Sequence, residues 1–372
     1  MDAALFQIAE RVRAALADHT PLRLRGGGSK DFHALQLQGD LLDTRDWRGI
    51  VSYEPSELVV TVRAGTPLAE LEAVLAAQGQ CLAFEPPHFG AATVGGMVAT
   101  GWSGPSRASV GAVRDYVLGV ESLNGRAELL RFGGQVMKNV AGYDVSRLMA
   151  GSWGTLGLIT EVSLKVLPVA PGETTLRFDG LSQAEALQRL NQWGGQPLPL
   201  NASCWVPDAA GADTGSGTLY LRLRGARAAV EAACRSLGGV RLDDAATAAD
   251  WQACREQTLP WFAQRAADHV LWRLSVPQTA PVLALPHGVG APLIEWHGGL
   301  RWVQAPRSQG PALQALAQSV GGSASLFRAE SAGQISASPI FDVQNPAVQR
   351  IQAQLRQAFD PVGIFNPGRT MA

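Results

Sequence analysis

Apolar positions recur at helical spacing over the first twenty residues. The apolar face of this pattern carries Leu5, Ile8, Ala9, Val12, Ala15 and Leu16. This period predicts an amphipathic helix whose apolar face covers a core. Charged residues such as Asp2, Glu10 and Arg11 break the uninterrupted apolar stretch that a signal peptide requires.

The pattern then changes to short runs rich in β-branched and apolar residues. These runs predict strands at residues 22–24, 50–53, 58–62, 81–84, 116–122, 127–132 and 158–167. Between them, Thr66 is the expected N-cap and Pro67 the first-turn residue of a helix that runs to about Gln78, where Gly79 would end it. A second amphipathic pattern predicts a helix at residues 346–358.

The residue usage changes near residues 168–172. Beyond this point the chain is rich in Ala, Leu and Trp. Most of its tryptophans are expected in a core, and the others at an interface, where aromatic residues are enriched. We therefore divide the chain into residues 1–170, 171–340 and 341–372. The interleaved strands and helices predict an α+β fold, with two small α+β units in the first part and a further α+β domain in the second.

The composition of the chain excludes several classes of protein. The chain has 31 basic and 32 acidic residues and a net charge of −1, so it lacks the basic surface that nucleic-acid binding requires. Its 4 cysteines form no CxxC pair, which argues against a disulfide framework or a metal cluster. No segment approaches the roughly 18 consecutive apolar residues of a membrane span. A soluble, cytoplasmic protein is expected.

Three glycine-rich segments lie at the ends of predicted strands or helices. They are Arg25-Gly-Gly-Gly-Ser-Lys30, residues 91–105, in which Thr93 can cap a short helix, and residues 151–161. Consecutive glycines bring peptide N–H groups close to an anion such as a pyrophosphate. Each segment alone could also be a tight turn without a ligand. None of them matches the P-loop or the Rossmann fingerprint.

The order of these segments resembles the vanillyl-alcohol-oxidase (PCMH-type) flavoprotein superfamily. The resemblance rests on Arg25-Gly-Gly-Gly-Ser-Lys30, Ala92-Thr-Val-Gly-Gly96, Val113-Arg-Asp-Tyr-Val-Leu-Gly-Val-Glu121 and Gly151-Ser-Trp-Gly-Thr-Leu-Gly157. Residues 138–144 and the closing residues 363–369 look like the D-2-hydroxyacid dehydrogenase branch. Residues 132–138 and 271–277 are similar to the family of bacterial glycolate oxidase E subunits in particular.

The resemblance implies a PCMH-type FAD-binding domain of two α+β subdomains, an α+β cap domain, and a C-terminal segment that returns to the flavin domain. It implies FAD contacts from Arg25, Gly26, Gly27, Gly28, Ser29, Lys30, Thr93, Gly95, Gly96, Thr100, Gly101, Gly104, Asp115, Gly154, Gly157, Ile159 and Asn366. For Asp115, a bond to neighbouring N–H groups at a strand end is an equal alternative, because phosphates repel a carboxylate. Ser29 stands where members with covalent flavin carry a histidine, so non-covalent FAD is expected.

The chain also departs from the catalytic members of the branch. Trp153 replaces their glutamate, and the histidine cluster that binds their metal is missing, so no metal site is expected. His297 stands where that cluster would be but is a lone histidine, which we do not interpret as a ligand. Lys138 and Tyr143 match the family motif and either lie near the flavin ring or serve only as a solvated lysine and a core tyrosine. The catalytic residues stay unassigned.

Two functions therefore remain open at the level of sequence. In the first, the chain is the FAD-binding subunit of a complex that oxidises glycolate to glyoxylate with a larger FAD-containing D subunit and an iron–sulfur F subunit. In the second, it is a non-catalytic assembly or electron-relay subunit of that complex. A stand-alone NAD(P)H-dependent reductase is disfavoured because no second dinucleotide motif is visible. Any attachment to the inner membrane would run through the partner subunits.

Overall fold

The computed structural model describes residues 2–33, 38–134, 143–208, 215–329 and 345–369. The chain begins with helix α1 (Ala3–Asp18), which Asp2 caps through a bond from the N–H of Ala4. Strands β1 (Leu22–Arg25) and β2 (Asp40–Asp43) follow and pair in parallel. The predicted helix is confirmed, and all its expected core residues but the half-buried Leu16 are buried.

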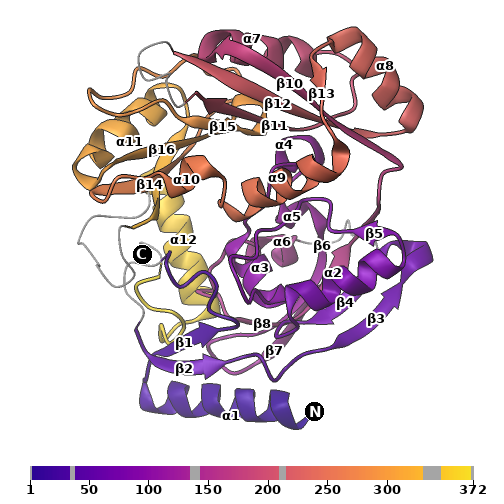
Figure 1. Cartoon of the computed structure of the whole chain (residues 1–372). Helices are drawn as coiled ribbons and strands as arrows, with labels where there is room; N and C mark the ends of the chain where they lie inside the picture. Colours follow the sequence, from indigo (N-terminus) through magenta and orange to yellow (C-terminus); the bar gives the residue numbers. More distant parts are fainter. Residues whose placement is uncertain (1, 34–37, 135–142, 209–214, 330–344, 370–372) are drawn as a thin grey trace.

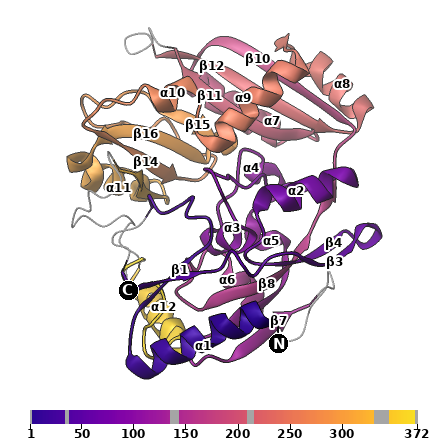
Figure 2. The same cartoon turned by 60° about the horizontal axis from the view of Figure 1, so that its bottom comes forward.

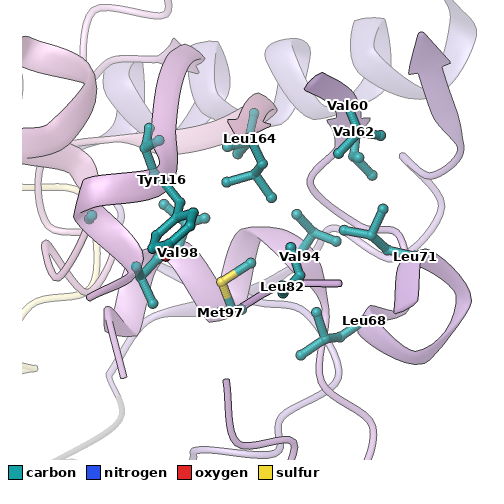
Figure 3. Close-up of a cluster of buried hydrophobic side chains, with 14 of the residues drawn as sticks. Val60, Val62, Leu68, Leu71, Leu82, Val94, Met97, Val98, Tyr116 and Leu164 are labelled. Carbon is teal, nitrogen blue, oxygen red and sulfur yellow. The ribbon is translucent and has the colours of Figure 1, made fainter. Parts of the chain in front are cut away.

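A five-stranded antiparallel sheet forms the centre of the first part, in the order β3, β4, β8, β6, β7. Its strands are β3 (Ile50–Glu54), β4 (Val59–Arg63), β6 (Val117–Leu123), β7 (Leu129–Gly133) and β8 (Leu158–Lys165). Helices α2 (Leu68–Ala77), α3 (Val94–Thr100), α4 (Arg107–Val110), α5 (Val113–Tyr116) and α6 (Val145–Met149) accompany it. Figure 3 shows the core, where Val60 and Leu164 of the sheet face the apolar side chains of α2 and α3.

Two details of the first part differ from expectation. Of the strand expected at residues 81–84, only Cys81 lies in a strand, β5 (Gln80–Cys81), which pairs with β9 (Leu167–Pro168). The chain turns at once, because Glu85 has a positive φ of 48° and its N–H bonds to the carbonyl of Leu82. Thr66 does not cap α2, since its hydroxyl donates to the carbonyl of Arg63, at 2.7 Å.

The second part is built on an eight-stranded antiparallel sheet in the order β13, β10, β12, β11, β15, β16, β14, β17. Its strands are β10 (Gly172–Ser182), β11 (Leu200–Pro207), β12 (Ser216–Gly225), β13 (Val240–Arg241), β14 (His269–Ser275), β15 (Leu293–Glu295), β16 (Leu300–Pro306) and β17 (Ser323–Arg328). Its helices are α7 (Gln183–Gly194), α8 (Arg227–Leu237), α9 (Asp244–Glu256), α10 (Pro260–Ala263) and α11 (Gly310–Ser319). The α+β class is confirmed.

The two faces of this sheet have different neighbours because side chains alternate along each strand. On β11, Trp205 packs in the cluster that contains residues of α7 and α8, whereas its neighbour Cys204 belongs to a cluster with Trp102 and Trp153 of the first part. Helices α7 and α8 therefore lie at the far end of the molecule from α1 (Figures 1 and 2). Trp251, Trp272 and Trp302 are also buried, as expected.

The C-terminal segment returns to the first part. Helix α12 (Pro346–Phe359) leads to Asp360, whose carboxylate accepts the N–H groups of the next turn, including that of Phe365 at 2.8 Å. Phe365 then pairs with Leu22 of β1 in a parallel bridge. Asn366 accepts the N–H of Leu24 and donates to the carbonyl of Trp153, so the tail joins β1 to the third glycine segment.

A buried ion-pair network connects the two parts. The carboxylate of Glu85 forms ion pairs with Arg222, at 2.7 Å, and with Arg224, at 3.0 Å, both from β12. Burial raises the pKa of Glu85, but the two arginines outweigh burial and the net direction of that pKa is downward. The network thus holds the turn after β5 against the second sheet.

Glu85→Ala is expected to lower the free energy of unfolding by about 3–5 kcal/mol, because it leaves the buried guanidinium group of Arg222 without its carboxylate and Arg224 with Glu173 as its remaining partner. In the wild-type protein this contribution is complete above the ordinary pKa of 4.5 and is lost as the pH falls through the lower folded value. Urea unfolding at several pH values measures both effects. Glu10→Ala, which removes an exposed pair with Arg13, is the control and should change stability by less than about 1 kcal/mol. Equal stability of the two variants would contradict this assignment.

Candidate functional site

The three glycine-rich segments, distant in sequence, meet around one groove. The groove is lined by residues 24–31 after β1, by residues around α3, by residues 153–159 before β8, and by the tail. It includes these residues expected to contact FAD: Arg25, Gly26, Gly27, Gly28, Ser29, Lys30, Thr93, Gly95, Gly96, Thr100, Gly154, Gly157, Ile159 and Asn366. Thr93 caps α3, as expected, and its hydroxyl accepts the N–H of Gly96 at 3.3 Å.

The first segment requires glycine for steric reasons. A Cβ on Gly27 would lie 1.4 Å from the carbonyl oxygen of Ala91, a distance that no rearrangement of side chains can relieve. Gly28 has a φ of 71°, which residues with a Cβ rarely adopt. The loop can therefore follow this path only with glycine at these positions.

The donors that line the groove suit a diphosphate. Within the described part of the chain, the N–H groups of Gly26, Gly27, Gly28 and Ser29 find no hydrogen-bond acceptor. Arg369 donates to the carbonyl of Lys30 at 3.3 Å, yet its Nε is buried without a partner. Unsatisfied N–H groups beside a buried guanidinium form an anion site, so these residues fit the pyrophosphate of FAD.

Lys30 lines the same groove but is already engaged. Its ammonium group donates to the carbonyl of His88 and to the hydroxyl of Ser29, both at 3.2 Å. Burial lowers the pKa of Lys30 to about 8, although the carboxylate of Glu256 acts in the opposite direction. At neutral pH the ammonium form therefore predominates and adds positive charge to the groove.

Three of the expected residues lie away from the groove. Gly101 lines the larger cavity described next, and Gly104 lies beside a small internal cavity. The carboxylate of Asp115 accepts the N–H of Ala112 at 2.8 Å, at the start of α5. This bond matches the alternative reading of Asp115, a residue that satisfies neighbouring N–H groups.

A cavity of about 900 Å³ adjoins the groove and shares Thr100 and Trp153 with it. Both parts of the chain contribute to its wall. Arg107 and Arg114 come from the first part and Arg273 from β14 of the second. Among the described residues, no aspartate or glutamate lines this cavity. The cavity is therefore electropositive and suits an anionic ligand.

Arg273 and Arg107 share one aromatic platform. Their guanidinium carbons lie 5.1 and 4.5 Å from the ring centroid of Trp296. Within the described ranges the guanidinium group of Arg273 has no hydrogen bond or ion pair. Burial, followed by the positive charge of Arg107, lowers the pKa of Arg273 to about 10, so it stays cationic at neutral pH. An unpaired arginine at a cavity wall is a natural carboxylate ligand.

Trp153 lines both the groove and the cavity, a place that the sequence did not predict for it. It is buried at a φ of 56°, its ring stacks on His33 with centroids 5.0 Å apart, and Arg369 lies over it at 5.1 Å. Burial lowers the pKa of His33 to about 4, so the imidazole is neutral near pH 7. Arg369 lies in the closing motif at residues 363–369, and this position could have indicated its place in the groove. Arg273 lies in residues 271–277, which resemble the family, but nothing in that segment marks the arginine as a site residue.

The remaining candidates are placed as follows. Lys138 lies outside the described residues, and Tyr143 is 98% exposed. His297 lies between two hydroxyls, with Nε2 3.0 Å from Ser109 and Nδ1 3.1 Å from Ser203. Over the described ranges, no three His, Cys, Asp or Glu side chains come together as a metal site.

Comparison with known proteins places these features in context. A family model described as an FAD binding domain matches residues 6–133. Glycolate oxidase subunit GlcE of Escherichia coli is 44% identical over 98% of this chain and 96% of its own length. D-lactate dehydrogenase of Archaeoglobus fulgidus is 31% identical over 48% of this chain and 41% of its own, and glycolate oxidase subunit GlcD of Bacillus subtilis is 32% identical over 34% and 27%.

The solved structures add evidence on the fold. An alkyldihydroxyacetonephosphate synthase superposes with a TM-score of 0.66 over 97% of this chain and 75% of its own, at 16% sequence identity. That identity supports a shared fold and no more. The relative that matches nearly end to end decides the family: this chain belongs to the FAD-binding glycolate oxidase subunit GlcE family, within the vanillyl-alcohol-oxidase superfamily.

Proposed function

We propose that this chain is the FAD-binding subunit of a complex that oxidises glycolate, a 2-hydroxy acid, to glyoxylate and passes the electrons to partner subunits. The name of the end-to-end relative supports this substrate. The observation that carries the proposal is the groove with unsatisfied N–H donors that adjoins a cavity whose described charged residues are all arginines. The partners proposed are a larger FAD-containing D subunit and an iron–sulfur F subunit.

The residues of the groove have distinct proposed roles. Residues 26–30 and Arg369 would hold the pyrophosphate, and Ile159 would meet the adenine. The diphosphate and ribityl region would be lined by Thr93, Gly95, Gly96 and Thr100, whereas Gly101 and Gly104 lie outside the groove. Bound there, FAD supplies a two-electron acceptor. Asp115 is proposed to cap α5 rather than to touch the cofactor.

The cavity is proposed to receive the substrate. Arg273 would hold the carboxylate of glycolate, and Arg107, which contacts the same Trp296 ring, would add positive charge to the cavity. The aromatic wall formed by Trp102, Trp153 and Phe327 would exclude water from this end of the cavity. The described lining contains no carboxylate that could accept the hydroxyl proton of the substrate. This absence supports a second candidate function, that of an electron-relay subunit.

The position of the complex in the cell is part of the same proposal. Among the helices of the described residues, none is long and apolar enough to cross a membrane. We propose a cytoplasmic location, with any attachment to the inner membrane made by the partner subunits.

The test is reconstitution of the complex from its three subunits. Complexes that contain this chain with FAD should reduce an artificial electron acceptor when glycolate is added, and complexes that lack the chain should not. The control adds the chain with FAD removed, which separates assembly from flavin chemistry. Full activity in complexes without this chain would overturn the proposal.

We also expect the purified chain to be yellow and to release its FAD on acid or heat denaturation. Ser29 carries no nucleophile suited to flavin attachment, and among the described residues that line the groove there is no cysteine or histidine. Absorbance of the supernatant after acid precipitation measures the release. Flavin that stays with the precipitate would contradict non-covalent binding.

A further inference from the structure

Arg273 lies at the wall of two cavities. Besides the large cavity, it lines a small internal one of about 30 Å³, together with Glu295 of β15. Strand β16 lies between β14 and β15 in the sheet, and the two side chains point to the same face. Thus the arginine proposed to bind the substrate shares the small cavity with a carboxyl group that does not line the large cavity.

Glu295 is 3% exposed and has no salt bridge among the described residues. One carboxyl oxygen accepts the indole N–H of Trp302 at 2.7 Å, and the thiol of Cys254, from α9, also acts to lower the pKa of this carboxyl. The neighbouring free thiol of Cys204, on β11, and burial raise the pKa of Cys254, which stays protonated. The carboxyl therefore has neutral donors and no direct counter-ion.

Other charges reach Glu295 only from a distance. Arg273 of β14 is the cation that acts on it, and Glu85, on the turn after β5, is the further carboxylate. Burial raises the pKa of Glu295 to about 7, and the donors Trp302 and Cys254 and the charge of Arg273 act in the opposite direction. Glu85 is itself paired with Arg222 and Arg224. Arg107, from α4, acts on Arg273.

We infer that Glu295 is a positioning residue that competes with the substrate for Arg273, so that binding of a carboxylate in the large cavity is coupled to protonation of Glu295. This inference rests on the proposed function, since it takes Arg273 as the carboxylate ligand. Its physical basis is that two carboxylates near one buried guanidinium repel each other, and one of them is neutralised by taking up a proton.

The coupling has a definite sign. With Glu295 protonated, the charge of Arg273 is uncompensated and attracts the substrate, whereas ionised Glu295 offsets that charge. An anion on Arg273 raises the pKa of Glu295 further, so binding above about pH 7 takes up a proton. Because the pKa of Arg273 is about 10, the arginine stays charged through this range.

The experiment uses the full FAD-loaded chain and acetate, a monocarboxylate without an oxidisable hydroxyl. The quenching of tryptophan fluorescence by acetate gives a dissociation constant (Kd) at each pH between about 6 and about 9. We expect the Kd of the wild-type chain to rise by up to about tenfold per pH unit above about pH 7. Glu295→Gln keeps an acceptor for Trp302 and should give a Kd that is low and independent of pH.

Two variants complete the design. Glu121→Gln changes another buried carboxyl, which lies on β6 and pairs with Arg131, and should retain the wild-type pH dependence. Arg273→Met should abolish acetate binding. Loss of binding in Arg273→Met without any pH dependence in the wild type would overturn the role of Glu295 and leave the proposed substrate site intact. Unchanged binding in Arg273→Met would overturn both.

Discussion

Gly27→Glu is expected to abolish FAD binding while the second part of the chain remains folded. The new Cβ would lie 1.4 Å from the carbonyl oxygen of Ala91, which forces the loop away from the groove. The added carboxylate would also repel a pyrophosphate held by the adjoining N–H groups. Fluorescence titration with FAD measures the affinity, and circular dichroism measures the retained fold. Gly194→Ala, at a helical position with free space around it, is the matched control.

A loop that is displaced could also destabilise the first part, so a milder variant separates the two effects. Arg369→Met keeps an unbranched apolar stem and removes the guanidinium group, with its buried, unpaired Nε, without changing the backbone. Loss of a charge-assisted bond of about 1.5–3 kcal/mol corresponds to a roughly 10- to 150-fold weaker affinity for FAD. If both variants bound FAD as the wild type does, the groove would not be the cofactor site.

Local patterns in the sequence were sufficient to predict most of the helices and strands of the first part. The heptad-like face of α1 and the glycine that ends α2 predict their elements directly, because each depends on neighbours within a few residues. The strand expected at residues 81–84 failed for a reason that lies elsewhere in the chain. Glu85 turns toward Arg222 and Arg224, more than a hundred residues away, and no local pattern encodes that pairing.

The same distinction applies to the candidate site. The glycines of the groove are visible in the sequence, since their spacing follows from the backbone path that a diphosphate requires. The cavity is not, because it forms only where α4 meets the second sheet and brings Arg107 and Arg273 to one indole ring. The second part of the chain contains few recognisable motifs for this reason. It contributes to the cavity wall through single side chains on long strands, which no local pattern marks.

The isolated FAD-loaded chain is expected not to be reduced by glycolate or D-lactate at a rate that supports turnover. Oxidation at the α-carbon requires a base for the hydroxyl proton as well as a cation for the carboxylate. The described lining of the cavity supplies the cation in Arg273, but its only imidazole is His33, a weak base because burial lowers its pKa to about 4. Trp153 occupies the position of the acid in catalytic relatives and cannot accept a proton.

Anaerobic stopped-flow mixing with glycolate or D-lactate, followed by the flavin absorbance, measures this rate. Absence of a positioned base typically slows the step by about 10²- to 10⁴-fold, so the flavin should stay oxidised on the time scale at which the complete complex bleaches. Reduction by dithionite in the same cell shows that the bound flavin is reducible. Rapid bleaching by either acid without partner subunits would show that this chain supplies its own base for the oxidation. It would also contradict the alternative in which the chain serves only as an electron relay.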